Sequence, residues 1–249
     1  MSSVRIRYPA PLNTYIMHEI LRPIFDNFYT TQRCAINMQS DGGGPFGFDI
    51  HFAIEVDYLI KMYNCDAIIE TGTNAGDTTD YLSKNYSDKT IITSEINQDI
   101  FEQAQKRLSN KTNVVLHNDS SELVLKRYRD KFSMPFYYLD AHWYDYWPLK
   151  DELDSIDRGI ICVSDFKLGI NKHGIIYDGD SYNGIDLNYN FLLNCGITET
   201  IYSNNYNNIE KYPLPCLQVG RRTGRAYFCK GIPDTHLESN TLFFTRVNN

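Results

Sequence analysis

Five carboxylates stand at regular intervals in the middle of the chain, and each closes a short apolar run. They are Glu70, Glu95, Asp119, Asp140 and Asp165. Successive runs begin about 22 to 24 residues apart, which leaves room for one helix and two short loops in each crossover between parallel strands. Acidic residues also cap helices, and this alternative explains any one of the five better than all of them. Because ligands bind beyond the carboxyl ends of parallel strands, the spacing predicts an acidic edge that accepts hydrogen bonds or protons.

A glycine turn follows the first of these runs. Residues 66–76 pass from a short apolar strand through Gly72 and Gly76 to a helical-looking segment, 77–83. The two glycines let the backbone approach a ligand closely, because they carry no Cβ. A dinucleotide fingerprint would have a glycine where Asn74 stands and another three residues after Gly76. The pattern therefore disfavours a pyrophosphate cradle and leaves a smaller adenosine-bearing ligand open.

The densest candidate site for chemistry is the segment 140–147, just beyond the fourth run. It holds two tryptophans, two tyrosines, one histidine and two aspartates, which could form a wall for a sugar or an aromatic acceptor. His142 could take a hydroxyl proton, although a histidine after a strand is more often a satisfied hydrogen-bonding residue. Lys167, close to Asp165, is a second candidate base. Asp140 could pair with a cofactor amine, bind a metal or position the substrate.

The residues so far resemble the motif series of class I S-adenosylmethionine-dependent methyltransferases. The resemblance covers roughly residues 66–166 and rests on the run Glu-Thr-Gly-Thr-Asn-Ala-Gly-Asp-Thr-Thr at 70–79, on Glu95, on Asp119 with Ser120, and on Asp140. It implies that the first acid and the glycines hold the methionine part of the cofactor, that Glu95 binds the ribose hydroxyls and that Asp119 lies beside the adenine. The cofactor-binding residues it implies are Glu70, Gly72, Thr73, Asn74, Gly76, Thr78, Glu95, Asp119, Ser120 and Asp140.

Within that superfamily, residues 139–145 resemble the fourth-strand segment of metal-dependent catechol-type O-methyltransferases. Ser164 and Asp165 are similar to their fifth-strand acidic pair, and related macrolide-sugar methyltransferases and cephalosporin-hydroxylase-like proteins share the layout. Tyr144 stands where the catechol enzymes carry a lysine base, and Phe166 replaces the second metal-binding side chain. A Mg²⁺ site would thus have Asp140 and Asp165 as its two carboxylates, with water or substrate completing the oxygen ligands.

The resemblance implies an α/β fold: a Rossmann-like, doubly wound, seven-stranded and mostly parallel sheet with an antiparallel last strand. The first five strands are predicted to start near Asp66, Thr90, Asn113, Pro135 and Gly159. We expect one methyltransferase-like domain over residues 1–249. It comprises an N-terminal helical extension and lid (1–64), a cofactor-binding core (65–169), and an acceptor-side insertion with terminal strands (170–249).

The flanking segments contain the helices and loops that must position the site. Residues 15–32 read as an amphipathic helix interrupted or restarted at Pro23. The glycine-rich loop 39–48 is either a lid over the cofactor or a plain connector. Residues 49–62 look helical, and there His51 and Glu55 are expected to form a surface pair. Asn97 is a plausible helix cap, 187–193 a helix, 198–203 and 224–230 two strands, and the tail could add another.

Composition excludes several classes of function. The formal net charge of -7 argues against a nucleic-acid partner. No apolar run is long enough to cross a membrane and the N-terminus has no signal-peptide core, so we expect a cytoplasmic protein without a membrane partner. Six scattered cysteines without metal-ligand spacing fit buried free thiols. The expected partner is a small-molecule or glycan acceptor, and a homodimer is left open.

These observations predict an O-methyltransferase that uses S-adenosylmethionine, with Mg²⁺ as an optional second cofactor and a small hydroxylated acceptor such as a sugar. Asp140, His142 and Lys167 are the catalytic candidates. Three alternatives stay open: a nicotinamide-dependent oxidoreductase, which the missing glycines disfavour, a metal-dependent hydroxylase, and a cofactor-binding subunit without activity of its own.

Overall fold

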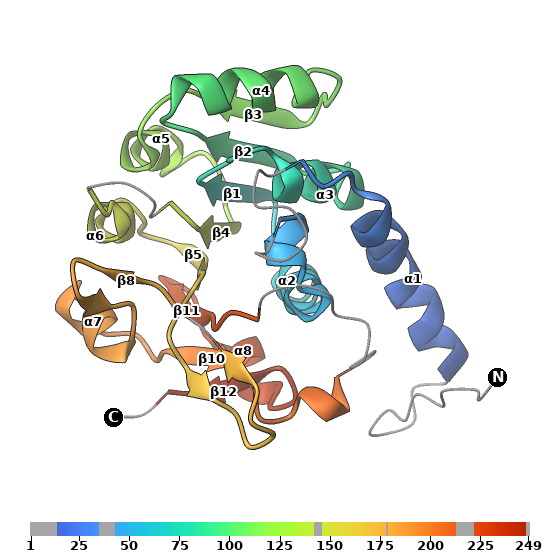
Figure 1. Cartoon of the computed structure of the whole chain (residues 1–249), viewed down its shortest axis with the longest axis vertical. Coiled ribbons are helices and arrows are strands. Elements are labelled where there is room, and N and C mark those ends of the chain that lie inside the picture. The colour runs from blue at the N-terminus through green and yellow to red at the C-terminus, as the bar shows by residue number, and fades with distance from the viewer. Residues whose placement is uncertain (1–13, 35–42, 142–145, 178, 213–221, 248–249) are drawn as a thin grey trace.

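The computed structural model describes residues 14–34, 43–141, 146–177, 179–212 and 222–247. Its centre is a twisted sheet with helices on both faces (Figure 1). The five predicted strands are β1 (Ala67–Thr71), β2 (Thr90–Ser94), β3 (Val114–His117), β4 (Pro135–Leu139) and β5 (Gly159–Val163). Each strand begins within one residue of its predicted start. The prediction is this close because polar residues flank each apolar run, and such a run fits a strand buried on both faces.

The strand order confirms the predicted fold class. With the terminal strands β10 (Tyr202–Asn204), β11 (Ala226–Lys230) and β12 (Phe244–Arg246), the order is β12-β10-β11-β5-β4-β1-β2-β3. Strands β1 to β5 are mutually parallel, and β11 is inserted antiparallel between β5 and β10. The sheet of the described residues has eight strands where seven were predicted, because the tail adds β12 to the free edge of β10.

Helices cover both faces of this sheet, as Figure 1 shows. On one side lie α1 (Thr14–Thr30), α2 (Ile50–Met62) and α3 (Asp77–Asn85), and on the other α5 (Ser121–Tyr128), α6 (Leu149–Asp154) and α7 (Tyr189–Asn194). The helix α4 (Gln98–Leu108) lies beside β3. Two apolar cores fill the two interfaces, one on each side. Strands buried on both faces explain why their sequences are apolar throughout rather than alternating.

The predicted interruption of the first helix is wrong, because α1 continues through Pro23. A proline inside a helix removes one hydrogen bond and normally kinks the chain. Here Leu21, Ile24 and Phe28 on both sides of Pro23 are buried in the same core. Packing of this face therefore outweighs the local cost.

The segment after α1 enters the core through a left-handed turn. In η1 (Pro45–Phe48), Phe46, Gly47 and Phe48 all have positive φ angles, of 52°, 62° and 59°. Left-handed backbone is costly for residues other than glycine. Phe46 offsets this cost with ring contacts to Phe52 and Tyr138 at centroid distances of 4.7 and 5.3 Å. Residues 39–42 of the predicted lid lie outside the described residues.

The predicted surface pair on α2 is wrong, because His51 and Glu55 are both buried. Glu55 accepts two hydrogen bonds from Arg225, from Nε to Oε2 and from Nη2 to Oε1, each 2.9 Å long. Arg225 Nη1 also donates to Asp49, the cap of α2, at 2.9 Å. The partner of this helix face comes from 170 residues away in sequence, so no local pattern reveals it.

The acceptor-side insertion consists of two short hairpins before α7. They are β6 (Gly169–Ile170) with β7 (Ile176–Tyr177), and β8 (Ser181–Tyr182) with β9 (Ile185–Asp186). The side chain of Asn97 caps α4, as predicted, and Asn188 caps α7 in the same way. The remaining elements are η2 (Ile209–Lys211) and α8 (Thr235–Ser239).

The five cysteines in the described part of the chain are free thiols, as predicted. Cys65, Cys162, Cys195 and Cys229 are buried and unpaired, Cys34 is exposed, and Cys216 lies outside the described residues. Within the described part of the chain, none of the helices has the length and apolar character that a membrane span requires.

Candidate functional site

A cavity opens at the carboxyl ends of the central strands, where the chain order reverses between β1 and β4. Such a reversal is the usual place for a ligand in an open α/β sheet. Six of the ten predicted cofactor residues line the cavity: Gly72, Asn74, Glu95, Asp119, Ser120 and Asp140. They come from four successive strand ends, so the tertiary structure brings together residues that the sequence spreads over about 70 positions.

The turn after β1 forms the floor of the cavity. Gly72 has a φ of +78°, and a Cβ there would come within 2.8 Å of the Asp140 carbonyl oxygen. Gly72 N and Thr73 N both donate to the carbonyl of Ser94, at 3.1 and 2.9 Å. Only glycine lets β1 and β4 approach this closely while keeping the left-handed turn.

Glu95 is held at the rim of this turn by two backbone groups. Asn74 N donates to its Oε2 and Asn97 N to its Oε1, each at 2.9 Å. Each carboxylate oxygen can accept a further hydrogen bond. The side chain is therefore fixed in direction while retaining the capacity to accept two hydroxyl donors from a ligand.

The other four predicted cofactor residues lie behind the cavity lining. Glu70 is buried, where its Oε2 accepts from the Thr79 hydroxyl and, at 2.8 Å, from Thr93. Thr73 shares a 2.6 Å hydrogen bond with Thr93. Gly76 begins α3 with a φ of 76°. Thr78 accepts from Phe46 N at 3.0 Å, which fixes η1 to α3.

The surroundings of Glu70 change its protonation. Burial raises its pKa to about 8, an effect that the charges of Asp140 and Glu95 increase and the two threonine hydroxyls oppose. Near neutral pH the group is therefore largely protonated. Glu70 therefore differs from a solvent-exposed carboxyl group, which would be ionised at this pH.

At the end of β3, Asp119 is engaged by protein donors. Arg127 Nη2 donates to Asp119 Oδ2 at 2.9 Å, and the backbone N of Ser120 donates to Oδ1 at 3.0 Å. Arg127 also contacts His117 Nδ1 at 3.2 Å, and His117 Nε2 lies 3.0 Å from the Tyr128 hydroxyl. Burial and the Arg127 charge lower the pKa of His117. The basic end of α5 thus has a local structural role.

Asp140 and Asp165 both lie close to the hydroxyl of Tyr138. That hydroxyl donates to Asp140 Oδ2 at 2.8 Å, and burial followed by the Asp140 charge raises the pKa of Tyr138, with a smaller effect from Asp165. Among the described residues there is no group of three or more His, Cys, Asp or Glu side chains arranged to hold a metal ion. Phe166, beside Asp165, is buried in the core. The described side chains thus offer no set of three protein ligands, and the two-carboxylate Mg²⁺ site stays a prediction.

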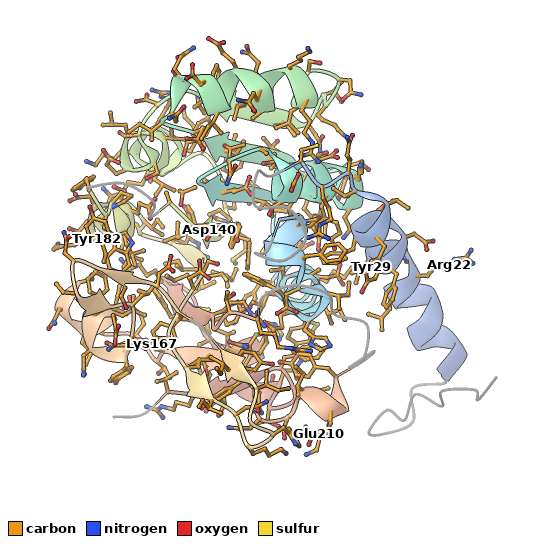
Figure 2. The ribbon with its side chains drawn as sticks, in the orientation of Figure 1. Arg22, Tyr29, Asp140, Lys167, Tyr182 and Glu210 are labelled. Carbon is orange, nitrogen blue, oxygen red and sulfur yellow. The ribbon has the colours of Figure 1, made fainter. Side chains whose placement is uncertain are left out.

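Of the two candidate bases, Lys167 does not join Asp140. Lys167 forms an ion pair with Asp186, with Nζ 2.8 Å from Oδ2. Figure 2 places it well apart from Asp140, beside the acceptor-side hairpins and terminal strands. His142 lies outside the described residues, as do Trp143, Tyr144 and Asp145. Their catalytic roles stay predictions.

Several cavity residues were not among the predicted ones. They are Ser94, Ile96, Ile100, Ser121, Glu122, Ala141, Tyr146 and Pro148. Ile96 is 60% exposed and supplies an apolar surface next to Glu95. Its position directly after the strand-end acid is a sequence signal that could have identified it. The hydrogen-bonding state of Ser94 and Glu122 depends on packing and has no such signal.

An aromatic cluster is built around Trp147, which lies between the cavity residues Tyr146 and Pro148 in the sequence. The Trp147 ring stacks on Phe191 at a centroid distance of 4.4 Å, and Tyr182 lies 5.9 Å from Trp147. These rings come from the segment before α6, from α7 and from β8. The contact joins the predicted aromatic wall to the acceptor-side insertion.

No family model and no curated protein matches this sequence. Among solved structures, the chain is similar to the O-methyltransferase TomG from Streptomyces achromogenes in complex with SAM (16% identity, 71% of this chain and 78% of that chain, TM-score 0.46). It is also similar to a methyltransferase from Geobacter sulfurreducens (11% identity, 90% and 91%, TM-score 0.45).

A third similar structure is a chain of a fibrillarin/Nop5p complex (14% identity, TM-score 0.34). The match covers 40% of this chain and spans about half, 49%, of that one. With all three identities below 25% and TM-scores below 0.5, we base the functional conclusion on the strand order and the cavity.

Proposed function

We propose that this chain is an S-adenosylmethionine-dependent O-methyltransferase acting on a small hydroxylated acceptor. The position of Glu95 is the observation that supports this most. Its carboxylate is fixed by Asn74 N and Asn97 N and lines a cavity at the reversal of strand order. A carboxylate in this state can accept both hydroxyls of a ribose. The cofactor would supply an activated methyl group on a sulfonium.

The cavity offers the remaining surfaces that such a cofactor needs. Ile96 and Ile100 supply apolar contact for a flat ring next to Glu95. The Gly72 turn lets the backbone approach the ligand closely on the side of Asp140. Methyl transfer is an in-line displacement, so the protein contributes mainly by aligning the two reactants and excluding water.

On the acceptor side, Asp140 is the catalytic candidate that lines the cavity. Tyr138 holds one of its carboxylate oxygens, so the group has a fixed direction. We assign it to orienting the acceptor hydroxyl and accepting its proton as the oxygen attacks. Trp147 and Tyr182 present aromatic rings near this edge, which favours a sugar ring of a glycan or a secondary metabolite as acceptor. A cytoplasmic location and a homodimer stay predictions.

The test is calorimetric binding of S-adenosylmethionine and S-adenosylhomocysteine to the full chain, with NADH as a competing candidate. We expect micromolar affinity for the first two, and at least about tenfold weaker binding in Glu95→Ala, because the ribose loses its charged acceptor. Glu102→Ala, on the exposed face of α4, is the matched control. No binding of either ligand at millimolar concentration, or an unchanged affinity in Glu95→Ala, would overturn the proposal.

A further inference from the structure

Two enclosed polar atoms in the cavity lining have no hydrogen-bond partner among the described residues: Ser94 Oγ and Glu122 Oε2. Ser94 ends β2 and is 2% exposed, so its hydroxyl has no access to bulk water. Glu122 lies in the first turn of α5. Buried polar groups in folded proteins are almost always paired, because an unmade hydrogen bond is costly. Two such atoms beside one cavity indicate a ligand that completes them.

The Glu122 carboxyl group is already oriented for this role. Its Oε1 accepts from the Ser120 hydroxyl at 2.7 Å, which fixes the group and leaves Oε2 as the acceptor without a donor. The missing partner must therefore carry an N–H or O–H group. Ser94, by contrast, can donate as well as accept, because a hydroxyl has both capacities.

Asp119 differs from Glu122 in this respect. Both of its carboxylate oxygens already accept hydrogen bonds, one from Arg127 and one from the Ser120 backbone. The resemblance in sequence places Asp119 beside the adenine, and each of its oxygens can still accept a second hydrogen bond, as in Glu95. Glu122, three positions later on the helix itself, differs because its Oε2 has no donor at all among the described residues.

A carboxylate acceptor and a hydroxyl donor that line the same cavity complement the edge of a 6-aminopurine, which presents an exocyclic amine and a ring-nitrogen acceptor. Ile96 and Ile100 provide the apolar surface that such a ring would cover. We infer that Glu122, with Ser94, recognises the amino edge of the cofactor's adenine and selects it against 6-oxopurines. This inference rests on the proposed function.

The experiment compares two ligands that differ only at this edge, S-adenosylhomocysteine and its deaminated form, S-inosylhomocysteine. The deaminated ring presents an oxygen where the amine was, so Glu122 faces an acceptor instead of a donor. We expect wild-type protein to bind the adenosyl ligand at least about tenfold more tightly in calorimetry. In Glu122→Gln the amide can donate or accept, and we expect the ratio of the two affinities to fall within about threefold of unity. Ser94→Ala should weaken binding of the adenosyl ligand several-fold.

Glu102→Gln is the matched control, since it makes the same chemical change on the exposed face of α4 and should keep the wild-type ratio. Asp119→Asn tests the neighbouring carboxylate that also lines the cavity. Thermal melts of each variant establish that it is folded. If wild-type protein binds both ligands equally, or if Asp119→Asn rather than Glu122→Gln removes the discrimination, the inference is overturned while the proposed cofactor stands. Absence of binding to the adenosyl ligand in wild type would overturn the proposed function itself.

Discussion

Glu70 and Glu95 close two neighbouring strands, yet their carboxyl groups meet different surroundings. Glu95 lines the cavity and is held by backbone N–H groups, whereas Glu70 is enclosed with two threonine hydroxyls. Burial disfavours the charged form of a carboxyl group more than two neutral hydrogen bonds favour it. Burial therefore raises the pKa of Glu70 and keeps it in the interior, whereas Glu95 faces the cavity, where a ligand can reach it.

At the residue scale, Glu70 should make stability depend on pH. Its pKa in the folded chain is raised to about 8 from 4.5, so between these values the folded state holds a proton that the unfolded state has lost. Stability therefore falls as pH rises through this window, by up to about 1.4 kcal/mol per pH unit. Glu70→Gln removes the titrating group and should remove this slope. Urea unfolding at pH 5.5 and 7.5 measures it.

Glu102→Gln is the control for this measurement, because Glu102 is exposed on α4 and forms its hydrogen bond with Gln98. It should keep the wild-type pH dependence. If Glu70→Gln and wild type lose the same stability between the two pH values, Glu70 titrates normally in the folded protein and the assignment is wrong.

At the scale of elements, the site depends on how closely the turn after β1 approaches the end of β4. The turn after β1 and the end of β4 must lie close together if the Gly72 turn, Glu95 and Asp140 are to line one cavity. The backbone contacts from Gly72 and Thr73 to the Ser94 carbonyl fix the turn to β2. The approach toward Asp140 depends on the absence of a side chain at Gly72.

We predict that Gly72→Ala weakens S-adenosylhomocysteine binding at least about tenfold, because the new Cβ would lie 2.8 Å from the Asp140 carbonyl oxygen and push the strand ends apart. Gly184→Ala is a closely matched control. Gly184 has the same φ of +78°, but a Cβ there would meet nothing within 4 Å. Both variants should lose about 1 kcal/mol of stability to the left-handed backbone. Equal binding by the two variants would show that the close approach is not needed for the site.

At the scale of the whole molecule, one buried network joins the start of the chain to its end. Arg225 in the segment leading to β11 binds Glu55 of α2 and its cap Asp49, and Tyr212 and Tyr227 donate to Glu55 at 2.9 and 2.6 Å. The core on the same face contains Phe28 of α1, Ile68 of β1 and Phe244 of β12. Residues of α1, β1 and β12 therefore share one interior, and the single domain stays a prediction.

Arg225→Ala should destabilise the protein by about 3 to 5 kcal/mol, because it leaves the buried carboxylates of Glu55 and Asp49 without their cation. Arg129→Ala, which breaks the exposed pair with Asp157, should leave stability unchanged within error. Urea unfolding followed by near-ultraviolet and far-ultraviolet circular dichroism measures both. Wild type should give one coincident transition, and separate transitions would contradict the shared interior.

The sequence by itself determined the order of strands and helices, the cap Asn97, and the placing of five acids at strand ends. These features follow from apolar runs, turn residues and helix capping, which act over a few residues. The regular spacing of the apolar runs was also enough to predict a parallel sheet. Together with the family resemblance, it predicted the antiparallel strand beside β5.

Only the tertiary structure decided which of these polar groups line a cavity and which form hydrogen bonds or ion pairs with other side chains. Glu70 is enclosed, Asp119 is bound by Arg127, Lys167 pairs with Asp186, and Glu122 keeps a free acceptor. Burial and hydrogen-bond partners set the state of a carboxyl group, and both come from segments distant in sequence. Arg225 and Glu55, 170 residues apart, are the clearest case, because nothing near either residue indicates its partner.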